Sequence, residues 1–337
     1  MRPNFSRRVR ALQNEISGNF LDAIITSDPN DVFYYTGYET QERSCFLIID
    51  TVSSKPKLFV PPLENRAKNV KTAEVIFYHS IKEVSDSLNF YNRTGFDERN
   101  MNASVFIKLG RELKKAHDII KIPRMVKDDY ELSCIEKSIK ITAKCLKEMK
   151  FYGKTEKTAC FELQKIMLDN KVYPAFMPII ASGKNTAFVH YVPGDTKIKK
   201  DILLVDVGVR YGGYCSDVTR VYFSSKGYAK FYKDVMEMRE YILDAIRPGI
   251  SFKEINTLYE KLMKEKGYKI FHSFGHGLGL SVHEKPEGED ILQEGMILTV
   301  EPGVYVKNKG GCRIEDMVLV RKGKPRILTK SIQLELV

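Results

Sequence analysis

Residues 201–223 read DILLVDVGVRYGGYCSDVTRVYF, with apolar, β-branched segments on both sides of Tyr211-Gly212-Gly213. Such segments favour strands, and adjacent glycines favour the tight turn of a hairpin. The run therefore predicts an antiparallel hairpin with Asp206 inside its first strand and Asp217 inside its second.

The two aspartates share one face of this hairpin in either plausible register. A turn centred on Tyr211-Gly212 opposes Asp206 and Asp217 directly, with Cβ atoms roughly 4.5–5.5 Å apart, whereas a turn centred on Gly212-Gly213 makes them diagonal neighbours at about 7–8 Å. Two carboxylates this close among apolar residues are costly unless one is protonated or a cation lies between them. The alternative is a wetted sheet face, or an aspartate that serves a turn.

A second pair of acidic residues strengthens the prediction that a cation binds here. Glu301 ends the apolar run MILTVEPG at residues 296–303, and Glu315 lies in RIEDMVLV at residues 313–320, with the turn NKGG between the runs. This is another candidate hairpin in which each strand carries a carboxylate. Four carboxylates in strands suited to burial need positive charge, and divalent metal supplies it without burying several lysines.

Residues 271–286, FHSFGHGLGLSVHEKP, hold three of the six histidines. Two divalent ions would balance four carboxylates, and one neutral imidazole would complete an oxygen and nitrogen shell that suits Mn, Co or Zn. His276 is the candidate because its flanking glycines let the backbone pass close to a crowded site. His283 and Glu284 would lie at the rim, and we expect His272 to be structural or pocket-lining.

Bulk properties favour an ordinary globular protein of two domains. The chain has 337 residues, 43% of them hydrophobic and 29% charged, and this length exceeds the usual size of one core. A formal charge of +11 would suit a nucleic-acid partner. The Lys and Arg residues are spread along the chain, however, so we expect a solvated basic surface and no nucleic acid.

Targeting signals and cysteine pairs are not evident in the sequence. No apolar run is long enough to span a membrane, and the first residues lack the apolar core of a secretory signal. The cysteines show no metal-binding or disulfide spacing, which predicts reduced thiols. We therefore expect a cytoplasmic protein with no membrane partner.

The order of expected elements separates two domains. Strand-like runs alternate with helix-compatible segments in the first third, which predicts a small α/β domain that ends where Pro123 breaks the pattern, at about residue 124. A helix then opens with a capping box of Asp128 and Glu131, and another is bounded by Ser251-Glu254 and Gly267. Helices beside hairpins predict an α+β architecture for residues 125–337.

Five sequence blocks, in order, resemble the proline-specific peptidases of the "pita-bread" metallopeptidase family M24. The blocks are ASGKNTAFVHYVPGD, LLVDVGVRYGGYCSDVTR, SFGHGLGLSVHEKP, VEPGVYV and GGCRIED. NDVFYYTGY, at residues 30–38, is similar to the smaller N-terminal domain of prolidases and creatinase. The resemblance implies a catalytic pita-bread domain over residues 125–337 and a creatinase/prolidase-type, ribonuclease H-like α/β domain over residues 1–124.

The resemblance also implies roles for particular residues. Two divalent ions (Mn, Co, Zn or Fe) would be held by five ligands: Asp206, Asp217, His276, Glu301 and Glu315. Asp217 and Glu315 would bridge the ions, Asp206 would bind one ion, and His276 with Glu301 would bind the other. Glu301 would also shuttle a proton, His190 and His283 would donate hydrogen bonds to the substrate, and Arg313 would orient the carboxylates.

The function implied is metal-dependent hydrolysis of the Xaa-Pro bond in short proline-containing peptides, by a homodimer. An Xaa-Pro dipeptidase (prolidase) is the first hypothesis, and an Xaa-Pro aminopeptidase that accepts longer peptides is the second. A non-catalytic protein that binds peptide or nucleic acid on the same fold is a remote third. Prolidases often have an arginine just after the HExP run; here the candidate substitutes are Lys285 and a basic residue from a partner subunit, which leaves the choice between dipeptidase and aminopeptidase open.

Overall fold

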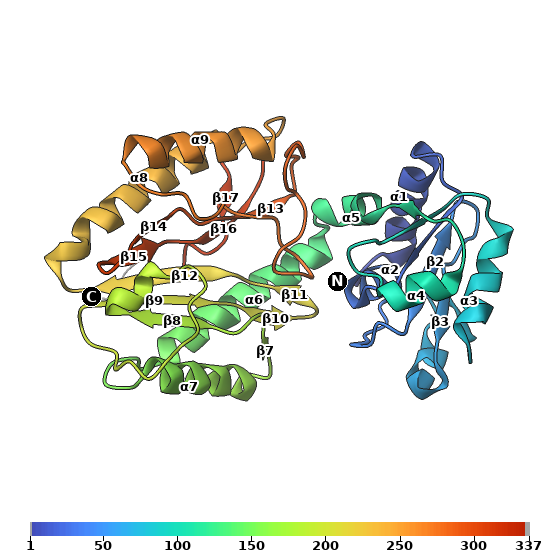
Figure 1. Cartoon of the computed structure of the whole chain (residues 1–337), viewed down its shortest axis with the longest axis horizontal. Coiled ribbons are helices and arrows are strands. Elements are labelled where there is room, and N and C mark those ends of the chain that lie inside the picture. The colour runs from blue at the N-terminus through green and yellow to red at the C-terminus, as the bar shows by residue number, and fades with distance from the viewer. Residues whose placement is uncertain (1, 334–337) are drawn as a thin grey trace. The chain divides into compact units, whose positions relative to one another are not determined.

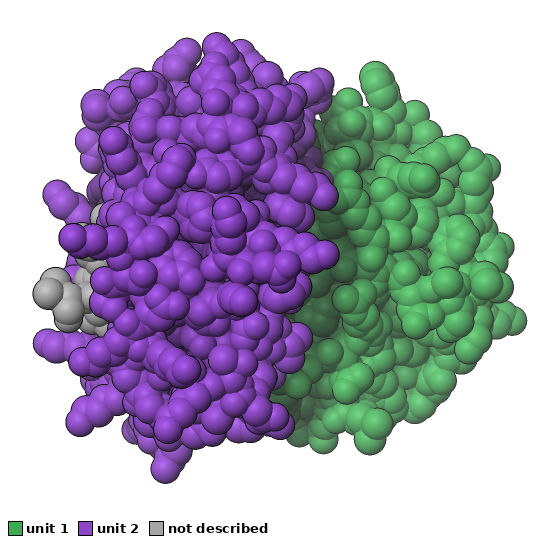
Figure 2. Space-filling model, turned by 60° about the vertical axis from the view of Figure 1, so that its left-hand side comes forward, with its two compact units in different colours: residues 1–124 green, residues 125–337 purple. Residues whose placement is uncertain are grey.

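The computed structural model describes residues 2–333. The chain divides into two compact units, Met1–Arg124 and Met125–Val337, coloured green and purple in Figure 2. Within the described part of the chain, no helix is long and apolar enough to cross a membrane. All six cysteines are buried and free, as the sequence predicts.

The N-terminal unit is a mixed six-stranded sheet with helices around it (Figure 1). The strand order is β4-β3-β2-β1-β5-β6; β1 pairs antiparallel with β2 and parallel with β5. The strands are β1 (Ala23–Thr26), β2 (Phe46–Asp50), β3 (Lys57–Val60), β4 (Glu74–Phe77), β5 (Thr94–Phe96) and β6 (Lys114–Lys115). The helices are α1 (Phe5–Gly18), α2 (Pro29–Thr36), α3 (Ile81–Ser87), α4 (Ala103–Leu109) and α5 (His117–Met125). The expected α/β domain is thus confirmed.

Pro123 does not break the pattern, which corrects the expectation from sequence. It lies inside helix α5, which continues to Met125. Proline has no amide hydrogen and costs a helix one backbone hydrogen bond. Two tyrosine hydroxyls bind this helix from α2, because Tyr35 donates to the Ile120 carbonyl at 2.8 Å and Tyr34 donates to the Pro123 carbonyl at 2.6 Å.

The C-terminal unit combines antiparallel sheets with four long helices (Figure 1). One sheet has the order β12-β9-β8, another β13-β16-β17, a third β11-β10-β7, and β14 pairs with β15. Helices α8 and α9 pack beside strands β13–β16, whereas α6 and α7 pack beside strands β7–β11. The strands are β7 (Tyr173–Pro174), β8 (Ile179–Ser182), β9 (Ile202–Val207), β10 (Val209–Tyr211), β11 (Tyr214–Cys215), β12 (Val218–Phe223), β13 (Ile297–Val300), β14 (Gly303–Val306), β15 (Gly310–Arg313), β16 (Asp316–Leu319) and β17 (Arg326–Ile327).

Two of these helices begin at the capping boxes read from the sequence. In α6 (Asp129–Glu148), Asp128 caps the backbone of Glu131, whose side chain bonds back to the cap. In α9 (Phe252–Glu265), Ser251 and Glu254 do the same. The other two helices are α7 (Glu156–Asp169) and α8 (Ala229–Ala245). The α+β architecture predicted for this unit is confirmed.

The register of the first hairpin places Asp206 and Asp217 as diagonal neighbours. Asp206 pairs with Thr219, and the turn centres on Gly212-Gly213, with φ of 58° and 87°. Positive φ at both central positions is what a tight hairpin turn with the strands' twist requires, and glycine adopts it without strain. The second of the two registers allowed by the sequence is therefore the one adopted.

The second pair of strands brings Glu301 opposite Glu315. Val300 pairs with Asp316 and Gly303 with Arg313, so the two glutamates face each other between these ladders. Glu315 also receives backbone pairing from the first hairpin, because its amide donates to the Thr219 carbonyl at 3.1 Å. The two hairpins are therefore in contact at the positions of their carboxylate side chains.

Candidate metal centre and catalytic cavity

One cavity of about 340 Å³ in the C-terminal unit is lined by all eight residues to which the family resemblance gives ligand, catalytic or orienting roles. These residues are Asp206, Asp217, His276, Glu301 and Glu315, together with His190, His283 and Arg313. They come from two hairpins and two loops, and span the chain from His190 to Glu315. The cavity is within the range of small-ligand sites, at its smaller end.

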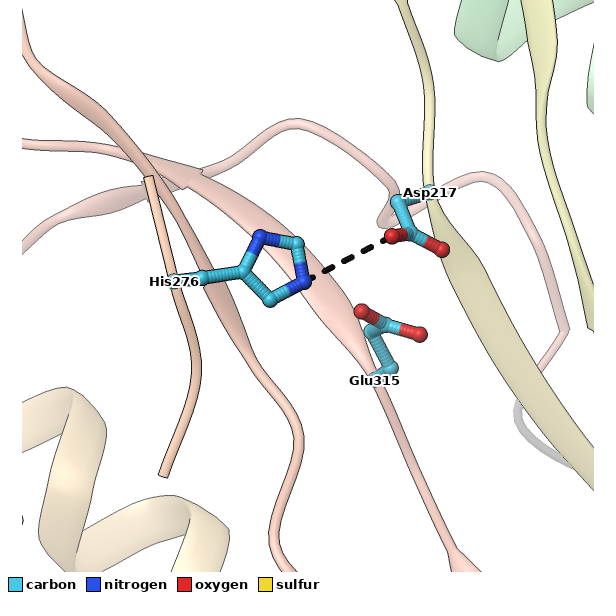
Figure 3. A group of neighbouring side chains, drawn as sticks. All are labelled: Asp217, His276 and Glu315. Atoms are coloured by element: carbon cyan, nitrogen blue, oxygen red, sulfur yellow. Dashed lines mark ion pairs between the residues drawn. The ribbon is translucent and has the colours of Figure 1, made fainter. Parts of the chain in front are cut away.

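Asp217, His276 and Glu315 form the tightest group in this cavity. Each offers one ligand atom, and these atoms lie within 4.8 Å of one another. Figure 3 shows the three side chains converging on a common point; Asp217 and Glu315 lie directly before strands β12 and β16, and His276 lies on a loop. Carboxylate oxygen with imidazole nitrogen is a donor set that suits Mn, Co, Zn or Fe.

The orientation of His276 points to a cation at that common point. Its Nδ1 lies 3.1 Å from the Gly277 carbonyl, so this nitrogen carries the proton and Nε2 presents its lone pair. Nε2 faces an oxygen of Asp217 at 3.6 Å and one of Glu301 at 3.4 Å. Burial lowers the pKa of His276, which favours the neutral ring. A lone pair that faces two carboxylates is repulsive unless positive charge lies between them.

The glycines beside His276 explain how its loop approaches the strands. A Cβ atom on Gly275 would lie 2.0 Å from the Thr299 carbonyl oxygen, and one on Gly277 would lie 2.3 Å from the Lys285 carbonyl oxygen. Any larger residue would push the loop away from the cavity. The reason proposed from sequence for glycine at these positions is confirmed.

Only one of the two carboxylate oxygens of Asp206 has a hydrogen-bond partner in the described part of the chain. Its Oδ2 accepts from Arg313 Nη2 at 2.6 Å, but its buried Oδ1 has no hydrogen-bond partner within residues 2–333. A buried, unpaired carboxylate oxygen is expensive and rare. Arg313 also donates to Thr219 Oγ1 at 3.2 Å, and Thr219 donates to Glu315 at 2.7 Å, so one arginine orients two of the carboxylates.

The charge of the cavity is unbalanced without metal. Burial and the neighbouring carboxylates raise the pKa of Asp217 and of Glu315 well above its ordinary value. Burial also raises the pKa of Glu301, although His272 and Arg313 oppose it. Arg313 alone cannot neutralise four acids, and the orphaned oxygen of Asp206 confirms that the donor set fits divalent metal.

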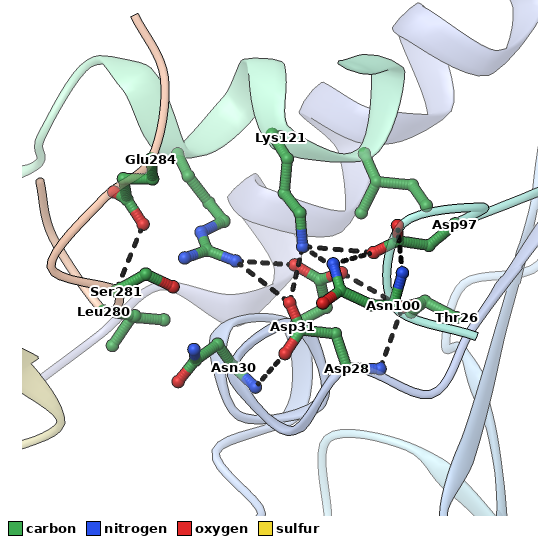
Figure 4. Close-up of polar contacts among 12 residues, drawn as sticks. Thr26, Asp28, Asn30, Asp31, Asp97, Asn100, Lys121, Leu280, Ser281 and Glu284 are labelled. Atoms are coloured by element: carbon green, nitrogen blue, oxygen red, sulfur yellow. Dashed lines mark hydrogen bonds and ion pairs between the residues drawn. The ribbon is translucent and has the colours of Figure 1, made fainter. Parts of the chain in front are cut away.

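A buried acidic group in the N-terminal unit provides a contrast (Figure 4). Asp28, Asp31 and Asp97 also converge, but Lys121 Nζ lies 2.6, 2.7 and 3.3 Å from their oxygens. Arg124 adds a second cation, 2.7 Å from Asp31. Burial alone would raise the pKa of Asp28, yet Lys121 and Arg124 lower it. This group contains its own cations, so it calls for no metal.

His190 lies on a loop held by one buried carboxylate that the sequence analysis did not identify. Glu156, which is fully buried, accepts from the Ser182 amide at 2.7 Å, from Asn185 Nδ2 at 3.0 Å and from the Tyr191 hydroxyl at 2.7 Å. The Gly194 amide donates at 3.3 Å. One helix residue thus fixes both ends of the segment that carries His190 to the cavity.

His272 lines the cavity as well. Its Nε2 lies 2.9 Å from the Tyr305 hydroxyl, which accepts from Arg313 Nη1 at 2.8 Å, and its Nδ1 is 4.0 Å from Glu301. Tyr305 was not identified from sequence. Its position two residues after VEPG gave no signal, because only the folded strands bring it between His272 and Arg313.

Lys285 does not take the place that the sequence hypothesis gave it. Its Nζ binds both oxygens of Asp290, at 3.2 and 3.0 Å, and it is absent from the cavity lining. Asp290 follows it by five residues in a tight turn, and the short ion pair holds the lysine there. Within residues 2–333, Arg313 is the only Lys or Arg residue that lines the cavity.

Comparisons with known proteins agree with these observations. Residues 133–322 match metallopeptidase family M24, and residues 8–127 match the creatinase/prolidase N-terminal domain. The chain is 31% identical to an Xaa-Pro dipeptidase of Pyrococcus furiosus, over 96% of this chain and 98% of that protein.

Solved structures of similar proteins cover nearly the whole chain. The prolidase from Pyrococcus horikoshii superposes with a TM-score of 0.86 at 29% identity, covering 96% of this chain and 98% of that one. An X-Pro aminopeptidase from Thermotoga maritima superposes with a TM-score of 0.84 at 28% identity, covering 96% and 97%. The matched ranges cover both units of the chain, and the chain therefore belongs to metallopeptidase family M24.

Proposed function

We propose that this protein is a metal-dependent Xaa-Pro dipeptidase with two divalent ions in the cavity of residues 125–337. Residues 1–124 are proposed as its accessory domain. The observation that carries the proposal is four carboxylates, three of them buried, and a neutral imidazole in one cavity, with Arg313 as the only Lys or Arg residue that lines it among residues 2–333. The similarity to a named Xaa-Pro dipeptidase over 96% of this chain supports the choice of substrate.

Asp206, Asp217, His276, Glu301 and Glu315 would hold the ions. When bound, Mn, Co, Zn or Fe supplies Lewis-acid activation of water and of the scissile carbonyl. The carboxylates must be ionised to bind, and the lowered pKa of His276 keeps its Nε2 available as a donor.

The other cavity residues would act on the substrate. Glu301 would take a proton from the attacking water and pass it to the proline nitrogen that leaves, a role that needs a carboxylate rather than an amide. His190 and His283 would donate hydrogen bonds to the substrate and to the developing oxyanion. Arg313 would keep Asp206 and Glu315 oriented through its bonds to Asp206 and Thr219.

An Xaa-Pro aminopeptidase is the second candidate, favoured by one observation. A dipeptidase must bind the free carboxylate of proline, and the basic residue considered for this role, Lys285, binds Asp290 instead. The charge that recognises the carboxylate would then come from His190 or from the second subunit of the homodimer that we propose. We further propose a cytoplasmic enzyme without a nucleic-acid partner, and we regard a non-catalytic binding protein as disfavoured by the intact donor set.

The substrate test separates these candidates. Metal-stripped protein, reloaded with Mn or Co, is expected to hydrolyse Ala-Pro and to leave Ala-Pro-Ala-Ala intact, because a site that binds the proline carboxylate cannot accept a peptide bond in its place. Release of free proline or of alanine is measured by chromatography. Cleavage of the tetrapeptide would identify an aminopeptidase, and no cleavage of either peptide would revive the binding protein.

Glu156→Gln is expected to lower kcat/KM for Ala-Pro by about 10- to 100-fold, through displacement of His190. The new amide would point N–H groups at the Tyr191 hydroxyl and the Gly194 amide, both of which donate to Glu156. The matched control is Glu162→Gln on the same helix, which loses only a part-exposed ion pair with Lys154. Steady-state kinetics and bound metal are measured for both. Unchanged kinetics in Glu156→Gln would show that the loop needs no such anchor.

A further inference from the structure

A second cavity in the C-terminal unit, of about 520 Å³, is lined mainly by cations. It shares no lining residue with the catalytic cavity. We call it the basic pocket and define it by its six basic residues, which are Arg220, Arg239, Arg321, Lys324, Arg326 and Lys330. Asp316 is the one acidic residue in the lining among residues 2–333.

The floor of the basic pocket carries a buried excess of positive charge. Arg220 Nη2 lies 2.8 Å from one oxygen of Asp316, and Arg239 Nε lies 2.8 Å from the other. Arg220 is completely buried and Arg239 is only 6% exposed. Two guanidinium groups therefore share this one buried carboxylate, and Arg239 also pairs with the exposed side chain of Glu240.

The rim of the basic pocket is exposed and only partly paired. Lys324 reaches Asp244 at 2.9 Å and Arg326 reaches Glu136 at 2.6 Å, in ion pairs between exposed side chains. Such pairs are weak, and an anion of higher charge density can displace them.

Two further rim residues, Arg321 and Lys330, are exposed and form no ion pair with any residue in the described part of the chain. Among residues 2–333, the six cations of the pocket keep a net charge of +2 even when Asp316, Asp244, Glu136 and Glu240 are all counted against them.

We propose that the basic pocket binds a small organic polyphosphate, with its phosphates at the rim cations. Guanidinium groups match phosphate oxygens with two parallel hydrogen bonds, and lysines add compact charge. The cavity is larger than a single phosphate needs, and it is also lined by Pro325, Ile327 and Ile332, which offer apolar surface to an organic group. A nucleoside diphosphate has both of these features.

The floor arginines are unsuitable for a test, because they also support the catalytic cavity. Arg220 Nη1 donates to the Glu315 carbonyl at 2.6 Å, so its loss would disturb a proposed metal ligand. The exposed rim residues can be changed without this effect. The test variant is therefore the double substitution Arg321→Ala with Lys330→Ala.

The experiment is titration calorimetry of the metal-loaded full chain with pyrophosphate, ADP and adenosine, at about 0.1 M salt to screen weak surface attraction. Pyrophosphate and ADP are expected to bind, ADP more tightly because of its organic group, and adenosine is expected not to bind. The double variant should bind both phosphates at least about tenfold more weakly. A control with the same charge change, Lys157→Ala with Lys165→Ala on α7, should bind them like the unchanged protein.

Three results would overturn the proposal. The first is absence of binding by both phosphates, and the second is binding of adenosine as tight as that of ADP. The third is equal binding of phosphates by the unchanged protein and the double variant, which would place the phosphates on the catalytic metals. Hydrolysis of Ala-Pro is measured separately in the same preparations. A negative result for phosphate binding can therefore be distinguished from a negative result for the proposed peptidase activity.

Discussion

Glu301→Gln is expected to lower kcat for Ala-Pro by about 10²- to 10⁴-fold. The amide is nearly the same size as the carboxylate, but it cannot accept a proton from water and deliver it to the leaving nitrogen. It also weakens one donor of the metal centre, because Glu301 Oε1 lies 3.4 Å from His276 Nε2 at the point where the donors converge. Loss of proton transfer and weaker metal binding both lower kcat. The measurement is steady-state kinetics at saturating metal, with bound metal determined in parallel.

The matched control is Glu294→Gln, which makes the same chemical change at an exposed position seven residues earlier in the chain. It should keep the activity of the unchanged protein. If Glu301→Gln keeps its metal and loses turnover, the proton shuttle accounts for the loss. Full activity in Glu301→Gln would exclude this residue from both roles and would require another acid in the cavity.

Removal of the metal is the second change with a large expected effect, on both activity and stability. Chelation should abolish hydrolysis, and reloading with ion at 100 times its dissociation constant should stabilise the folded protein by about 2.7 kcal/mol for each ion bound. The pKa values of Asp217, Glu301 and Glu315 are raised in the protein without metal, because burial and mutual repulsion disfavour their ionised forms. Metal requires those ionised forms, so the gain in stability should increase with pH.

The stability gain from metal increases with pH because the pKa values of these three acids are raised in the metal-free protein. An acid whose folded pKa exceeds its unfolded value stabilises the metal-free protein fully below the unfolded pKa, and that contribution is lost as pH rises through the folded pKa. Calorimetric Tm values, measured with chelator and with Mn from about pH 5 to about pH 8, should therefore diverge as pH rises. Asp217→Asn should show little metal-dependent gain at any pH. A gain that stays constant or shrinks with pH would contradict the assignment of these carboxylates as ligands.

The local structure of the two hairpins was largely predictable, because strand and turn preferences act over a few residues. The adjacent glycines in Tyr211-Gly212-Gly213 limited the hairpin to two strand registers, and both registers place Asp206 and Asp217 on one face. Choosing between them required the folded chain, in which Asp206 pairs with Thr219. The capping boxes at Asp128 and Ser251 were equally readable, since their hydrogen bonds join residues three apart.

Features that depend on distant partners were missed or misjudged. Pro123 was expected to end a pattern, yet Tyr34 and Tyr35 donate hydrogen bonds to the helix that contains it, from about ninety residues earlier. Glu156 gave no sign in the sequence that it holds the loop of His190, because its partners are separated from it by 26 to 38 residues.

The sequence by itself determined the kinds of side chain available for the site, the hairpins that carry them and the helix boundaries marked by caps. It could do so because these features depend on residue chemistry and on short-range geometry. Only the tertiary structure decided that Arg313 binds Asp206 while Lys285 binds Asp290, and that the carboxylates of the N-terminal unit enclose Lys121. Electrostatic balance depends on which charges meet after the strands have packed, and residues far apart in the chain meet only then.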